Sequence, residues 1–273
     1  MTLSIVALIL GVLAYGGAGA RLSDGAQGEA HPLKSFAWWV GTGLQGLGFI
    51  LTLLARQHLP LLIVQAAVVG ALAVTALIQH AAGTRRLRWV DGWAIFVVIL
   101  GIALLAATTV PGPAVPIAVN HLIVLGGGVV LCLATLPVIS NPGVSGLLSG
   151  LGFAISAITA RLLVADVAHA IWRFWEWPWT SWVAAFLLVA GLGLGQVHLT
   201  RGLARSHAVG VLGTNYLAST VVPAGIGAFM LGEAPREGTW WMVILGLCLA
   251  LAGSLSLLRP EAVAEPENAP APR

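Results

Sequence analysis

Long apolar stretches separated by short polar breaks run along the whole 273-residue chain. A helix needs about 20 mostly apolar residues to cross the roughly 30 Å hydrocarbon core of a bilayer. Each stretch that approaches this length predicts a membrane-spanning helix, because a helix satisfies its own backbone polar groups in lipid. The predicted spans cover 3–20, 36–55, 59–80, 90–109, 117–137, 143–163, 181–202, 207–231 and 240–258. We therefore expect an all-α polytopic membrane protein with about nine transmembrane helices.

The composition agrees with this expectation. Hydrophobic residues make up 58% of the chain and charged residues only 8%, whereas soluble domains carry about 25% charged residues. The net charge of +3 therefore does not indicate nucleic-acid binding. All 11 tryptophans lie at predicted span ends or in one connecting loop, where the polar N–H of an indole reaches the headgroup level.

A pentapeptide frame occurs twice along the chain. LARQH at 54–58 returns as LARSH at 203–207. Arg56 follows the second predicted span and Arg205 follows the seventh, so five spans separate them. Because five is an odd number, the two copies are predicted to lie on opposite sides of the membrane.

Further matches extend this repeat. Gly83 and Gly232 end the third and eighth spans at the same spacing, and Leu10-Gly11 with Arg21 resembles Leu151-Gly152 with Arg161. We predict two inverted structural repeats, 1–137 with five spans and 143–258 with four. Inverted repeats are typical of secondary transporters, whose substrate sites lie near the membrane midplane. Chance recurrence in a chain rich in Leu, Ala and Arg is the alternative.

The second half resembles a known transporter family in three segments: GLLSGLGFAISAITARLL (146–163), LARSHAVGVLGT (203–214) and FMLGEAPREGTWWMVILGLCLALAGSLSLL (229–258). They are similar to EamA-type proteins of the drug/metabolite transporter superfamily. The first half, WWVGTGLQGLGFILTLLARQHLPLLIVQ (38–65), resembles a divergent actinobacterial branch related to the NIPA-like magnesium transporters. The resemblance implies a transport fold with a peripheral fifth span, and it names no cargo.

The chain departs from that family in two places. Family members usually have ten spans, whereas 259–273 is a Pro/Glu/Ala tail that is too polar to span and is predicted to be disordered and cytoplasmic. The family's Leu-Gly-Glu sequence occurs at 231–233, but the first half carries Ala-Gly-Thr at 82–84.

The basic residues predict the orientation of the chain in the plasma membrane. One side holds Arg21, Lys34, Arg85, Arg86, Arg88, Arg201, Arg205, Arg259 and Arg273, and the other holds Arg56, Arg161, Arg173 and Arg236. The richer side is predicted to be cytoplasmic, which places the N-terminus outside and the C-terminus inside. Residues 1–20 could instead be a signal peptide, because GAGA precedes Arg21, but MTLS lacks the usual basic start.

Polar residues inside the predicted spans are the candidates for substrate binding. They are Gln45, Gln65, Gln196, His198, Thr214, Asn215, Tyr216 and Ser219. The alternative is that these side chains only bond neighbouring helices. Arg56 and Arg205 have two interpretations as well, as anchors that reach to the interface or as gate-side cations for an anionic cargo.

Two further sets of small residues concern helix packing. Ser145, Ser149, Gly152, Ser156 and Thr159 recur at helical spacing and predict close packing, with cavity lining as the alternative. The GxxxG pairs Gly146–Gly150 and Gly191–Gly195 receive the same packing interpretation.

These patterns favour a secondary transporter of small molecules that works by alternating access. The alternatives are a NIPA-like divalent cation (magnesium) transporter, disfavoured because no carboxylate lies in the middle of a span, and a non-transporting membrane scaffold. We predict no enzymatic activity, no cofactor and no metal site. The predicted partners are a small-molecule cargo and the lipid bilayer, without nucleic acid, and a homodimer is left open.

The predicted orientation can be tested with reporters fused after Arg273. A reporter that is active only in the periplasm should stay inactive there, and a cytoplasmic fluorescent reporter should be bright, because the C-terminus is predicted to lie inside. The reverse result would overturn the orientation.

Overall fold

The computed structural model describes residues 2–28, 35–83, 86–110, 115–165, 173–203, 205, 208–233 and 235–257. Within these ranges, 23–28, 203, 208–210, 212 and 213 are described by their backbone alone. The tail at 259–273 and most of the LARSH copy at 203–207 lie outside the described side chains.

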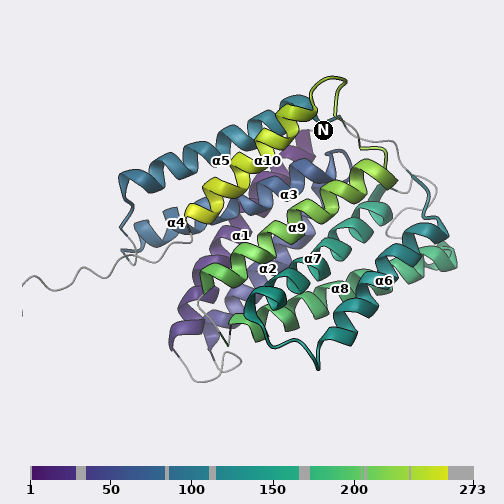
Figure 1. The fold of residues 1–273 in the computed structure, drawn as a ribbon, viewed down its shortest axis with the longest axis horizontal. Coiled ribbons are helices and arrows are strands. Elements are labelled where there is room, and N and C mark those ends of the chain that lie inside the picture. Colours follow the sequence, from purple (N-terminus) through teal and green to yellow (C-terminus); the bar gives the residue numbers. More distant parts are fainter. Residues whose placement is uncertain are drawn as a thin grey trace, which may run out of the picture.

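Every predicted span coincides with helix, as Figure 1 shows. The helices are α1 (Thr2–Gly28), α2 (Phe36–Ala55), α3 (Leu61–Val69), α4 (Ala71–Ala81), α5 (Trp89–Thr108), α6 (Val119–Thr135), α7 (Pro142–Ala165), α8 (Trp179–Leu203), α9 (Ala208–Met230) and α10 (Trp240–Ser256). In the Trp-rich connection, the described residues form one 3-10 turn, Phe174–Glu176.

Two elements differ from the prediction. The third span is interrupted at Gly70, which divides it into α3 and α4. A Cβ on Gly70 would lie 3.0 Å from the Ile102 side chain of α5, so the break lies where α5 approaches closely. Helix α1 runs eight residues beyond the predicted end of the first span, because the polar sequence after Ala20 contains no proline before Pro32.

Local sequence signals set the helix starts. Pro142 is the first residue of α7, where its missing N–H costs nothing. The Asn141 side chain accepts hydrogen bonds from the free N–H groups of Gly143 (2.9 Å) and Val144 (3.2 Å). At the start of α5, the Asp91 carboxylate accepts a hydrogen bond from the backbone N–H of Arg88 at 2.9 Å.

The surface of the bundle is strongly apolar. In the part of the chain that the structure describes, six helical stretches are long and apolar enough to cross a membrane: Thr2–Leu22, Phe36–Ala55, Leu61–Ala81, Trp89–Thr108, Pro142–Ala165 and Trp179–Gly202. Of the nine predicted spans, these segments support six, whereas the apolar helices α6 and α10 are shorter. Large hydrophobic side chains also point outward: Phe186 of α8 is 67% exposed and Phe229 of α9 is 90% exposed. Such a surface is compatible with a membrane protein, because water would not tolerate it.

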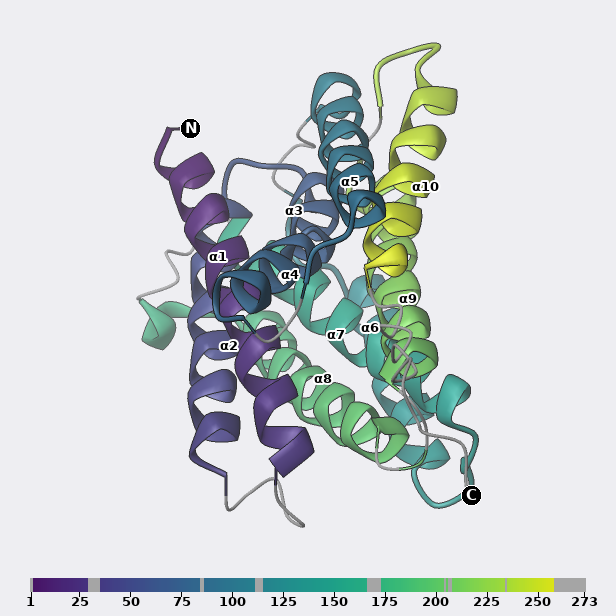
Figure 2. The same ribbon diagram turned by 90° about the vertical axis from the view of Figure 1, so that its left-hand side faces the viewer.

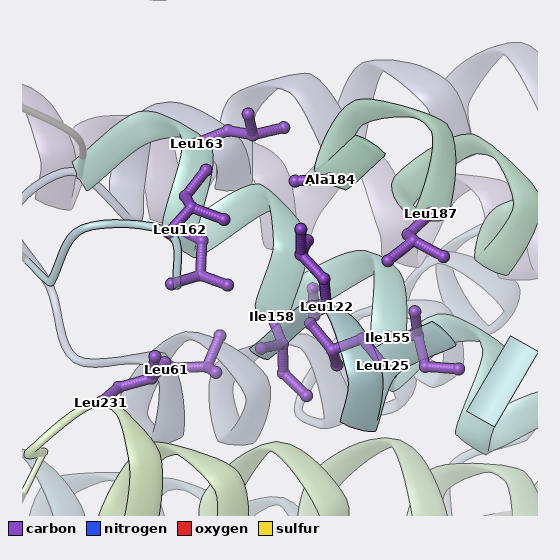
Figure 3. Packing of buried hydrophobic residues seen from close by; sticks show 12 residues of the cluster. Leu61, Leu122, Leu125, Ile155, Ile158, Leu162, Leu163, Ala184, Leu187 and Leu231 are labelled. Carbon is purple, nitrogen blue, oxygen red and sulfur yellow. The ribbon is translucent and has the colours of Figure 1, made fainter. Parts of the chain in front are cut away.

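Helix α7 forms the centre of the main hydrophobic core. Ile155, Ile158 and Leu162 of α7 are almost fully buried and pack with leucines from α3, α6 and α8 (Figure 3). Leu231, which follows α9, closes the same cluster. Helix α6 packs on α7 and α8 at the edge of the bundle.

Small residues let the helices around α7 approach backbone to backbone. A Cβ on Gly152 would lie 2.7 Å from the Gly195 nitrogen and 2.8 Å from the Gly191 oxygen of α8. The Ser156 hydroxyl of α7 donates a hydrogen bond to the Leu188 carbonyl of α8 at 2.9 Å. The serine stripe of α7 therefore packs against its neighbours, and the α8 glycines of one GxxxG pair face α7.

The first helix of each predicted half packs on two helices of that half: α1 packs on α2 and α4, and α7 packs on α8 and α9. Helix α3 contacts α9 and α5 runs beside α10, as Figures 1 and 2 both show. Helix α6, which the sequence assigns to the first half, packs on α7 and α8 of the second.

The matched glycines that end α4 and α9 share one conformation. Gly83 has a φ of 74° and Gly232 has a φ of 64°. This left-handed region is disfavoured for residues with a Cβ, and a glycine there commonly terminates a helix. The sequence match at 149 residues therefore has the same local structural role in both places.

Two glycines of α8 provide a test of the close packing. Gly191→Ala should destabilise the protein by about 1–3 kcal/mol, because the new methyl group would lie 2.7 Å from the Gly152 oxygen. Gly193→Ala is the matched control, because a Cβ there meets nothing within 4 Å. Thermal unfolding of the detergent-purified variants measures the difference, and equal melting temperatures would contradict this packing.

Candidate functional site

The predicted substrate-binding residues divide between two parts of the bundle. Thr214, Asn215, Tyr216 and Ser219 lie on α9 and Gln65 lies on α3, which packs on α9. Gln45 lies half-buried on α2, and Gln196 and His198 lie on α8.

The α8 residues do not join the α9 cluster. His198 is 2% exposed, and its Nε2 lies 2.9 Å from the carbonyl oxygen of Cys132 on α6. This contact ties α8 to α6, away from α9. Gln196 is half-buried, and its backbone carbonyl accepts a hydrogen bond from Thr200.

The α9 residues make contacts inside the second half. Asn215 is 5% exposed, and its Oδ1 accepts a hydrogen bond from the Ser149 hydroxyl of α7 at 2.9 Å. Ser219 and Thr220 both donate to the carbonyl of Tyr216. Pro223 lies inside α9 and removes the helical donor for the Ser219 carbonyl. The middle of α9 is thus rich in backbone and side-chain polar groups.

Gln65 is buried, with 6% of its surface exposed, on α3, the helix that packs on α9.

The structure also assembles a polar group that the sequence analysis did not assign to the site. Tyr15 of α1 packs its ring against Gly48 of α2, where a Cβ would lie 2.9 Å from the ring. The Tyr15 hydroxyl lies beside Thr52 and interacts electrostatically with Arg56. Helices α1 and α2 therefore contribute to one interior position, which we call the Tyr15–Arg56 site.

Arg56 does not reach out to an interface as an anchor. It is 2% exposed, and its guanidinium lies 5.4 Å from the centroid of the Phe49 ring. Phe49, Thr52 and Arg56 share one face of α2 at spacings of three and four. This spacing is the signal in the sequence that could have indicated the site. The other cation of the repeated frame, Arg205, is exposed, and its Nη1 lies 3.4 Å from the Ile139 carbonyl.

A buried ion pair closes the same end of the bundle. Arg161 Nε of α7 donates to Glu233 Oε1 at 3.1 Å, and both side chains are nearly inaccessible. The backbone N–H of Leu61, at the start of α3, donates to Glu233 Oε2 at 2.7 Å. The Nη1 of Arg161 donates to the carbonyl of Arg56. Residues of the second half thereby hold the α2–α3 turn of the first half.

The charge of Glu233 depends on these contacts. Burial raises the pKa of the Glu233 carboxyl, whereas the Arg161 guanidinium and the Leu61 N–H stabilise the carboxylate and oppose that rise. Its position is set by Gly232, whose left-handed conformation turns the chain after α9.

Comparisons of this chain with protein-family models, with curated proteins and with solved structures find no match.

The ion pair can be tested by a double-mutant cycle. Glu233→Gln should cost about 3–5 kcal/mol of stability, because it leaves the Arg161 guanidinium buried without its counter-charge. Adding Arg161→Gln should recover part of that loss, since no lone charge remains. Glu176→Gln is the control, because its pairing with Arg173 is half-exposed. Thermal unfolding measures the two single variants, Glu233→Gln and Arg161→Gln, the double variant and the control. If the loss in the double variant equals the sum of the two single losses, the coupling is contradicted.

Proposed function

We propose that the chain is an integral membrane protein that transports small molecules by alternating access between two inverted halves. The proposal rests chiefly on one observation: α3 contacts α9 and α5 packs along α10, and each pair joins helices that occupy matching positions in the two predicted repeats. Two related bundles joined in this way can exchange conformations, which gives states open to opposite sides.

The contact between α5 and α10 supports the inverted relation. A Cβ on Gly101 would lie 2.6 Å from the backbone nitrogen of Ala250. The numbers of these residues differ by 149, the spacing of the repeated pentapeptide frame. Residues related by a twofold axis touch each other only close to that axis, so this contact favours an axis between α5 and α10.

The tryptophans follow the same relation. Eight of the eleven lie near the N-terminal ends of α2, α5, α8 and α10: Trp38 and Trp39, Trp89 and Trp93, Trp179 and Trp182, and Trp240 and Trp241. In an inverted arrangement these four ends divide evenly between the two membrane surfaces, where indole rings are favoured.

The buried ion pair supports gating at one end. In the proposed orientation, with the N-terminus outside, the Arg161–Glu233 pair lies at the outer end of the bundle and seals it. The position that matches Glu233 in the first half is Thr84, which carries no charge. The inner end must therefore close by other contacts, so the two gates differ in strength.

The membership in the EamA-type drug/metabolite transporters and the plasma-membrane location are part of this proposal. The scaffold alternative would use the GxxxG faces for contact with other proteins. These faces are occupied within the chain, because a Cβ on any glycine of the two pairs would lie within 3.1 Å of a neighbouring helix. Neither that alternative nor the magnesium alternative gains a specific observation from the described residues.

Cysteine accessibility tests alternating access. In a background with Cys132→Ala and Cys248→Ala, Gln65→Cys and Asn215→Cys should each react with a membrane-impermeant maleimide from both membrane sides. The reason is that each proposed state opens the interior to one side. Phe229→Cys is the control, because Phe229 points outward from the apolar surface. Labelling of residues 65 and 215 from neither side would indicate a packed scaffold and overturn the proposal.

A further inference from the structure

The guanidinium of Arg56 is a buried cation without a hydrogen-bonding partner at two of its nitrogens. Nε and Nη1 are inaccessible and form no hydrogen bond with any residue that the structure describes. Arginine stays protonated in proteins, and its fork of N–H donors matches a carboxylate. Removing such a charge from water without a counter-charge is strongly unfavourable.

No described carboxylate compensates this charge. Glu233, the acid on the same end of the bundle, is already engaged by Arg161 and the Leu61 N–H. The Tyr15 hydroxyl acts on Arg56 electrostatically, but this hydroxyl is neutral at ordinary pH. The two arginines and Glu233 together leave one uncompensated positive charge in the interior.

The surroundings of Arg56 are suited to an organic group. The Phe49 ring lies 5.4 Å from the guanidinium carbon, and Tyr15 brings a further aromatic ring with a hydroxyl group from α1. The buried hydroxyl of Thr52 beside it already donates to the Phe49 carbonyl at 2.9 Å. Hydroxyl groups can donate to an anion, and the ring faces can contact an apolar body.

We infer that the Tyr15–Arg56 site binds a small organic anion, with its carboxylate on Arg56 and its apolar part against Phe49 and Tyr15. If the chain transports as proposed above, this anion is its cargo. Because the two free nitrogens are closed off in this structure, the anion reaches them in a state in which the helices around Arg56 have moved apart.

Ligand-dependent thermal stability of the purified protein tests the inference. Sodium benzoate and sodium acetate are the anionic probes, benzamide is the neutral isostere of benzoate, and sodium chloride keeps the ionic strength constant. At least one carboxylate should raise the melting temperature saturably, because a ligand of the folded state stabilises it, and benzamide should not. Saturable shifts from neither carboxylate, or an equal shift from benzamide, would overturn the inference.

Two arginine variants locate the effect. Arg56→Met should lose the carboxylate shift, whereas Arg205→Gln, which changes an exposed cation, should keep it. Without any ligand, Arg56→Met should melt at or above the wild-type temperature, since it removes an unpaired buried charge. A clear fall in its melting temperature would show that Arg56 is structural, and retention of the shift would place the anion elsewhere; either result overturns the inference.

A lipid phosphate is the other source of an anionic group. Adding phosphatidylglycerol to the micelles separates the two, and a shift that needs Arg56 but occurs only with this lipid would overturn a free organic anion. The cysteine labelling remains independent of these results. Binding of the carboxylate without labelling from both sides would leave an anion-binding protein that does not transport, whereas two-sided labelling without binding would leave a transporter of another cargo.

Discussion

Close contact between helix backbones is the constraint on which the rest of this fold depends. Gly152 of α7 has no room for a Cβ against α8, and Gly101 of α5 has none against α10. In apolar surroundings, helix association gains little from hydrophobic burial and depends on such packing and on interhelical hydrogen bonds. The same small residues that bring the helices together therefore also fix where the few polar side chains can meet.

Three charges in the interior are arranged unequally. Arg161 and Glu233 satisfy one another and hold the start of α3. Arg56, whose carbonyl accepts from Arg161, leaves two of its guanidinium nitrogens, Nε and Nη1, without a hydrogen-bond partner among the described residues. A paired charge stabilises a particular arrangement of helices, and an unpaired charge destabilises it until a counter-charge arrives. This asymmetry connects the packing at one end of the bundle to a conformational change that a ligand can drive.

Much of the helical layout could be predicted from the chain, because a run of about 20 apolar residues has few alternatives to a helix. The helix ends at Gly83 and Gly232 could also be predicted, because glycine readily adopts the left-handed conformation that terminates a helix. The interruption at Gly70 was not, because it depends on the approach of α5. The residues of the site were harder to predict from the sequence. His198 was a candidate but contacts the Cys132 carbonyl of α6, and Tyr15 was not among the candidates.

The sequence by itself determined which segments are helical, their order and the small residues along which they pack, since these depend on local composition and spacing. Only the tertiary structure decided which polar groups meet. Tyr15 and Arg56 lie far apart in sequence, and their proximity depends on how α1 packs on α2. Spacing along one helix fixes which face a side chain occupies, and it carries no information about what another helix brings to that face.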